Sequence, residues 1–167
     1  MKKITLILAV FGMMTLSSCS KDDDVDNDTI SEVWEYSLNV NYLASNNYTS
    51  VLFFPHPIYT SDMVLLYRLD DVVNGQDVWK PMPQTFYFND GTLDFRYDFS
   101  FTTTKATTYL EGYDLEGISL AFRTNQVIRV VVVPGFFGKT AEPLKSKEYK
   151  DVVKQFNIQE NKIVKIK

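Results

Sequence analysis

The chain has 167 residues, a formal net charge of −4, one cysteine and one histidine. A single cysteine excludes an intrachain disulfide and a thiolate metal cluster, and a single histidine excludes the His-x-x-x-His pair of many zinc sites. The negative charge argues against nucleic-acid binding, which needs a basic stripe.

The first eighteen residues are predicted to be a signal peptide. Lys2 and Lys3 precede an apolar stretch over residues 4–16, which is too short to span a bilayer core of about 30 Å but has the length of a secretory signal core. The following Leu16-Ser17-Ser18-Cys19 resembles the bacterial lipobox, in which the cysteine is acylated and the peptide is cut before it. We therefore expect a mature lipoprotein that begins at Cys19, held by several acyl chains such as palmitate. The alternative is an ordinary signal peptide with a chance cysteine.

An acidic segment over residues 19–32 is predicted to be a disordered tether, because its charges repel one another and it contains few apolar residues. It begins with Ser20, Lys21, Asp22, Asp23 and Asp24. A lysine and an acidic run directly after the lipidated cysteine resemble the surface-export signal of Bacteroidota lipoproteins, which implies a domain outside the cell rather than in the periplasm.

Calcium binding is a weaker alternative for the same segment. Four acids have the spacing of EF-hand positions 1, 3, 5 and 12, namely Asp24, Asp26, Asp28 and Glu35. Thr29, however, stands where the loop needs glycine, and a strand rather than a helix is expected to follow.

Residues 33–167 are predicted to form one all-β domain. Two segments alternate apolar and polar residues with period two, 34–42 and 93–101, so each is expected to bury one face. Three short apolar runs predict central strands covered on both faces: 51–54, 63–69 and 130–133.

Turn residues divide these strands. Hairpins are predicted at Asn74-Gly75 and at Asn89-Asp90-Gly91, and strand ends or edges at Pro55-His56-Pro57 and Pro81-Met82-Pro83. Seven or eight strands result, which indicates an antiparallel, immunoglobulin-like β-sandwich.

The C-terminal region changes period. Tyr149, Val152, Val153 and Phe156 are spaced as on one helix face, so a short helix over residues 146–156 is expected to cap an open end or edge of the sandwich. Residues 162–167, KIVKIK, predict a last edge strand whose lysines discourage edge-to-edge pairing.

No catalytic constellation is apparent, and we expect a non-enzymatic protein without metal or cofactor. Residues 117–121 lack the second glycine of a nucleophile elbow, and the lone His56, between two prolines, is expected to be structural. Three carboxylates, Glu111, Asp114 and Glu116, leave a glycan hydrolase as an unfavoured alternative.

The 24 aromatic residues raise a second alternative, a surface glycan-binding module. Tyr59 and Trp79 are the candidates for a sugar-stacking platform, whereas rings at alternating strand positions are expected to pack in the core. The strand arginines Arg68, Arg96 and Arg129 either form cross-strand pairs with Asp94 or Asp98 or converge on a site for an acidic group; we favour pairing.

Two segments resemble a known family. MVLLYRLDDVVNGQDVWKPMPQTFYFNDGTLDFRYDF and TNQVIRVVVVPGFF, between Met63 and Phe137, are similar to segments of small uncharacterised lipoproteins from flavobacteria and related Bacteroidota. The resemblance implies a β-rich domain in the cell envelope and no particular activity. We therefore expect an outer-membrane, lipid-anchored and surface-facing interaction protein, whose partner is an outer-membrane protein or a glycan rather than nucleic acid.

Overall fold

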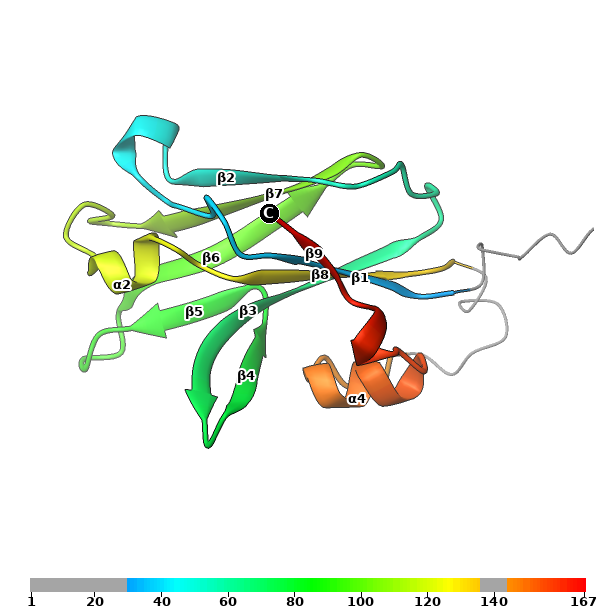
Figure 1. Cartoon of the computed structure of the whole chain (residues 1–167). Helices are drawn as coiled ribbons and strands as arrows, with labels where there is room; N and C mark the ends of the chain where they lie inside the picture. Colours follow the sequence, from blue (N-terminus) through cyan, green and yellow to red (C-terminus); the bar gives the residue numbers. More distant parts are fainter. Residues whose placement is uncertain (1–29, 136–143) are drawn as a thin grey trace, which may run out of the picture.

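The computed structural model describes residues 30–135 and 144–167. Within them, nine strands form two sheets packed face to face, and a short helix, α4, lies near the C-terminus (Figure 1). The predicted all-β sandwich with a C-terminal helix is therefore confirmed, and the described residues contain nine strands rather than seven or eight.

The larger sheet has five strands in the order β4-β3-β8-β1-β9. All neighbours are antiparallel except β1 and β9, which are parallel. Its strands are β1 (Glu32–Tyr36), β3 (Met63–Val73), β4 (Gln76–Pro81), β8 (Ile128–Val133) and β9 (Val164–Ile166).

The smaller sheet has four antiparallel strands in the order β2-β7-β6-β5. They are β2 (Thr49–Phe53), β5 (Gln84–Tyr87), β6 (Leu93–Phe101) and β7 (Lys105–Gly112). The remaining elements are η2 (Ala44–Asn46), α2 (Leu120–Arg123), α4 (Tyr149–Gln155) and η3 (Glu160–Lys162).

The hairpin predictions are confirmed by the backbone. Asn74 and Gly75 both have positive φ, at 51° and 76°, which is the geometry that a two-residue turn between twisted antiparallel strands requires. Gly91, with φ 86°, closes the turn between β5 and β6. Pro81 ends β4 and Gln84 begins β5 in the other sheet, so the proline-rich segment carries the chain across the sandwich.

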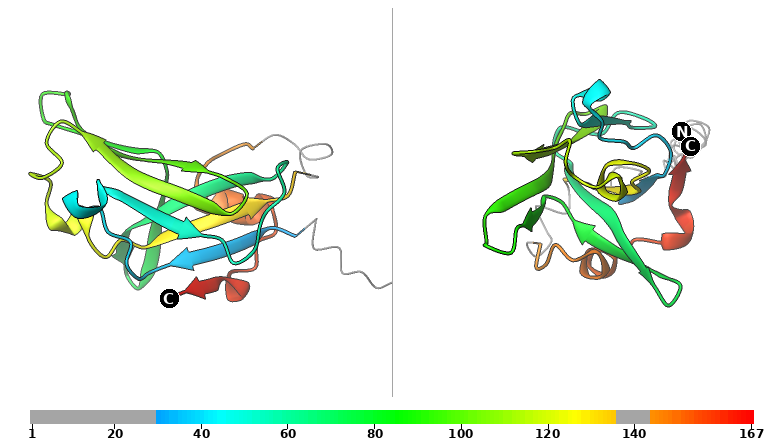
Figure 2. Two further views of the ribbon diagram at one scale, coloured as in Figure 1. Left: turned by 90° about the horizontal axis from the view of Figure 1, so that it is seen from above. Right: turned by 90° about the vertical axis from the view of Figure 1, so that its left-hand side faces the viewer.

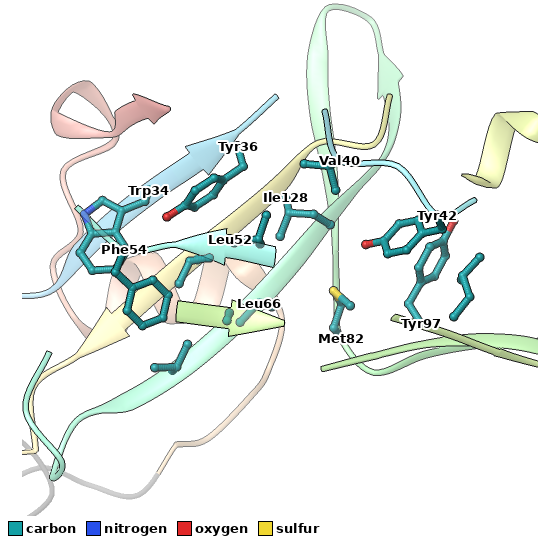
Figure 3. Packing of buried hydrophobic residues seen from close by; sticks show 14 of the residues in the cluster. Trp34, Tyr36, Val40, Tyr42, Leu52, Phe54, Leu66, Met82, Tyr97 and Ile128 are labelled. Carbon is teal, nitrogen blue, oxygen red and sulfur yellow. The ribbon is translucent and has the colours of Figure 1, made fainter. Parts of the chain in front are cut away.

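The main core lies between the sheets. Trp34 and Tyr36 of β1 meet Leu52 and Phe54 near one end, while Tyr42 and Tyr97 are in edge contact further along (Figure 3). Val40 and Tyr42, which follow β1 in the chain, are also buried.

A second apolar cluster lies on the outer face of the five-stranded sheet, where α4 packs (Figure 2). β8 explains why two clusters form: its alternate side chains serve opposite faces, and all six residues are buried. A strand covered on both sides reads as a continuous apolar run. Central placement of Val130–Val133 and of 63–69 is thus confirmed.

Four details of the prediction are wrong. β2 is an edge strand rather than a central one, and Val51 and Phe53 are exposed. Leu38 is exposed because Asn39, with φ 61°, ends the extended run after β1. Leu93 and Phe101 are exposed at the two ends of β6. Finally, α4 covers a sheet face instead of capping an end or edge. The predicted C-terminal edge strand is confirmed as β9.

Candidate functional site

The lipidation and export residues cannot be placed in the fold. Cys19 and the segment Ser20, Lys21, Asp22, Asp23 and Asp24 lie outside the described residues, and they stay predictions. Within residues 30–135 and 144–167, no helix is long and apolar enough to cross a membrane.

Tyr59 lies in the loop between β2 and β3, beside a pocket of about 450 Å³. The residue is 62% exposed, and the pocket is lined in addition by Ile30, Glu32, His56, Asp62 and Pro134, among others. Asp62 fixes the loop, because its carboxylate accepts hydrogen bonds from the Tyr59 amide (2.9 Å) and the Gly135 amide (3.1 Å). This carboxylate thus joins the loop to the end of β8.

His56 is partnered on the rim of the same pocket. Its Nε2 lies 3.0 Å from Glu32 Oε2 and its Nδ1 3.1 Å from the Pro57 carbonyl. The Pro57 carbonyl, followed by the Glu32 carboxylate, raises the pKa of His56 above its usual 6.5. The ring also meets Trp34 edge-on, with centroids 5.5 Å apart. These contacts hold the imidazole between β1 and its own loop.

Trp79 lies in a different environment, under α4. Only 7% of it is exposed; the Arg129 guanidinium carbon sits 4.0 Å from the ring centroid and the Tyr149 ring centroid 5.9 Å away. A pocket of about 490 Å³ opens beside it, with Asp77, Lys150 and Glu160 in its lining. Because Arg129 occupies a face of the ring, that face has no room to stack on a sugar.

The structure does not bring Tyr59 and Trp79 together. Trp79 pairs with Leu69 of β3, whereas Tyr59 precedes the first residue of β3, Met63. The six residue steps from Met63 to Leu69 alone span about 20 Å at the rise of a strand. The two rings therefore form no common platform.

The three strand arginines pair with acids, as favoured, but the partners differ from the prediction: Asp98 lies on the same strand as Arg96, and Arg68 and Arg129 pair with other acids. Arg96 contacts Asp98 (3.2 Å) and Glu111 (2.5 Å). Arg68 pairs with Asp70 and donates to Gln84 Oε1 and Gln126 Oε1. Arg129 pairs with Glu35 on the neighbouring strand at 2.9 Å.

The carboxylates considered for glycoside hydrolysis have local structural contacts. Glu111 pairs with Arg96, and Asp114 accepts the Gly117 amide at 3.0 Å. Arg123 donates to the Glu116 carbonyl, so it fixes the backbone of the same loop. Glycoside hydrolysis requires two carboxylates that flank a substrate cleft. None of these three acids lines the pocket beside Tyr59 or the pocket beside Trp79.

Glu35, the possible twelfth position of a calcium loop, is buried in an ion-pair network. Only 7% of the residue is exposed, and its two oxygens face Arg129 (2.9 Å) and Lys165 (3.4 Å). Asp24, Asp26 and Asp28 lie outside the described residues. Among the residues that the structure does describe, no group of three or more His, Cys, Asp or Glu side chains is arranged to hold a metal ion.

Sequence reasoning missed this buried network. Arg129 Nη1 donates to the Tyr149 hydroxyl at 2.8 Å and reaches Glu160 at 3.4 Å, which links β8 to α4 and η3. The sequence did contain a signal for this network, because Arg129 is a charged residue at the second position of the otherwise apolar IRVVVV. An arginine there must be paired if the strand is buried.

Comparisons of the chain with protein-family models, with curated proteins and with solved structures returned no match.

Proposed function

We propose that this chain is a lipid-anchored, non-enzymatic interaction protein of the bacterial outer membrane, with its β-sandwich facing the cell exterior. One observation carries the proposal: Leu16-Ser17-Ser18-Cys19 follows a short apolar stretch and precedes a lysine and three aspartates. A lipid anchor, an export signal and a folded domain would then follow one another along the chain.

The chemistry of the described residues supports an interaction role. Several charged groups at the two pockets contact other charged groups or the backbone: Glu32 contacts His56, Asp62 accepts two amides and Arg129 contacts Glu35. Such pairs stabilise a scaffold, whereas general acid–base chemistry needs a group poised toward a substrate.

Lipidation is tested in the producing bacterium with globomycin, which blocks the peptidase that cuts before a lipidated cysteine. We expect the precursor with residues 1–18 to accumulate. Mass spectrometry of the mature N-terminal peptide should find acyl chains on Cys19, and Cys19→Ala should abolish both the processing and the acylation. Normal maturation in the presence of globomycin would contradict the proposal.

Surface exposure is tested separately with whole cells and an added protease. We expect the domain to be removed by the protease in the wild type. A variant with alanine at Lys21, Asp22, Asp23 and Asp24 should be lipidated normally but protected from the protease. Equal digestion of the two proteins would contradict an export role for this segment.

A further inference from the structure

The exposed apolar side chains at one end of the sandwich are the starting observation. Five residues of this end are large, apolar and at least 36% exposed: Ile30, Phe53, Tyr59, Met63 and Phe101. We call them the tether-end patch, because the described chain begins there at Ile30 (Figure 1).

Pairings in the fold bring these residues to the same end. Ile30 and Tyr59 line one pocket. Phe53 pairs with Lys105, and Phe101 pairs with the next residue of β7, Ala106.

The loop that carries Tyr59 is tied to the same turn. The Ile58 amide donates to the Thr103 carbonyl at 2.8 Å, and the Phe54 amide donates to the Thr104 carbonyl at 2.9 Å. The five side chains of the tether-end patch therefore lie together at one end of the molecule and are not scattered over its surface.

Two acids at this end are compensated internally. Glu32 is paired with His56, and both oxygens of Asp62 accept backbone amides. Acids at the opposite end have local partners as well: Asp70 pairs with Arg68, Asp90 accepts from the Thr92 amide and Asp114 accepts from the Gly117 amide. Contact of the tether end with an apolar surface therefore leaves neither Glu32 nor Asp62 without a partner, which matters because unpaired charges are costly to remove from water.

The length of chain before Ile30 limits where a membrane can lie. Eleven residue steps separate Cys19 from Ile30; a flexible coil of that length, as the sequence predicts for this tether, has an end-to-end distance of about 18 Å. The nine residues of β6, which run from the far end to the tether end, span about 30 Å. A bilayer that holds Cys19 is thus close to the tether-end patch and further from the β5–β6 turn.

We propose that the tether-end patch rests on the bilayer that holds the lipid anchor, with Tyr59 and Phe53 at the level of the headgroups. Aromatic side chains are favoured at this level because the ring is apolar while its surroundings are partly wet. The contact is apolar, so it should persist at high salt, which screens exposed charges. The inference rests on the proposed lipidation of Cys19.

The test uses the complete mature lipoprotein in phosphatidylcholine vesicles. Because acylation occupies Cys19, the sole cysteine, Tyr59→Cys introduces one free thiol for an environment-sensitive fluorophore. Tyr87→Cys is the matched control: Tyr87 is a tyrosine of nearly equal exposure, 64% against 62%, at the end of β5 beside the β5–β6 turn. Nitroxide-labelled lipids then report which fluorophore touches the bilayer.

We expect a blue shift and strong quenching at position 59, little of either at position 87, and no reversal by salt. In the Tyr59→Cys protein, Phe53→Asp should reduce the quenching, whereas Phe88→Asp, at the other end, should leave it unchanged. Equal quenching at positions 59 and 87, or more at 87, would overturn the inference while leaving the lipidation proposal intact. Mass spectrometry of Cys19 distinguishes failure of the inference alone from failure of the lipidation proposal, because absent acyl chains would overturn both of them.

Discussion

Arg129 makes several independent contacts on the outer face of the five-stranded sheet. Its guanidinium pairs with Glu35, donates to Tyr149 and lies over Trp79. Arg129 and Glu35 are both less than 10% exposed. A buried ion pair of this kind adds little net stability compared with apolar residues, but the loss of one partner leaves an uncompensated charge.

We predict that Arg129→Met lowers the free energy of unfolding by about 3 kcal/mol, because Glu35 then keeps only the more distant Lys165. Urea denaturation of the wild type and the variant measures this loss. The double variant Glu35→Leu, Arg129→Met should recover most of it, since no buried charge remains. Additive losses in the double variant would contradict this account of the pair.

His56 should make stability depend on pH near neutrality. Its pKa is raised by the Pro57 carbonyl and the Glu32 carboxylate, so the folded state holds the proton more tightly than the unfolded state. Its contribution is therefore complete below the unfolded pKa of about 6.5 and is lost as the pH rises through the folded pKa.

We expect the free energy of unfolding to fall slightly as the pH rises through this range, and the slope to disappear in His56→Gln. The effect should be small because the side chain is 53% exposed and solvent screens exposed pairs. Proton NMR of the single histidine gives the folded pKa directly, and a value at or below 6.5 would contradict the prediction.

At the scale of elements, α4 is held by its apolar face rather than by its length. Seven residues are too few for a stable isolated helix, but Val152 and Tyr149 are buried against Val131 and Val133 of β8, among others. The helix thus exists because the sheet offers an apolar outer face.

We predict that Val152→Ala destabilises the fold by about 2 kcal/mol, from two lost methyl groups and the cavity they leave. Val72→Ala, at a valine that is 53% exposed, is the matched control and should change the free energy of unfolding by less than about 0.5 kcal/mol. Chemical denaturation measures both; similar values would show that α4 does not bury this face in solution.

β2 is the longer of the two described edge strands that contain no charged residue, the other being β5. Its neighbourhood from Tyr48 to Pro55 contains no charge, whereas β4 contains Asp77, Lys80 and Pro81, and β9 contains Lys165. Charges and prolines on an edge normally prevent pairing between molecules.

We therefore predict that Val51→Lys raises the concentration at which the unlipidated chain, beginning at Ser20, stays monomeric. Val164→Lys, on the β9 edge, changes the net charge equally at a position of similar exposure, 47% against 41%, and should have little effect. Light scattering over a concentration series measures both. An equal improvement would indicate an effect of net charge alone.

These elements show what the sequence could predict. Alternation and turn residues sufficed for the strands, the hairpins and the class of fold, because they reflect local backbone rules. Whether a run such as 51–54 is central or at an edge depends on which strand pairs beside it, and local pattern does not carry that information. For the same reason, Trp79 could be proposed as a binding residue although α4 and Arg129 cover it.

At the scale of the whole molecule, the two apolar clusters share their strands. Ile128, Val130 and Val132 of β8 face the core between the sheets, while Val131 and Val133 face α4. In β1, Trp34 likewise belongs to the core between the sheets, while Val33 belongs to the cluster under α4. Neither cluster can lose its packing without exposing strands that the other needs, so the domain should unfold as one unit.

The two tryptophans make this testable, because Trp34 lies in the core between the sheets and Trp79 in the cluster under α4. We predict that Trp34→Phe and Trp79→Phe each give a urea transition by fluorescence that coincides with the transition of the same variant by far-UV circular dichroism. Each variant then reports one cluster, and the comparison within a variant removes any change in its overall stability. An earlier fluorescence transition for Trp79 in the Trp34→Phe protein would show that α4 detaches first and that shared strands do not suffice to couple the two faces.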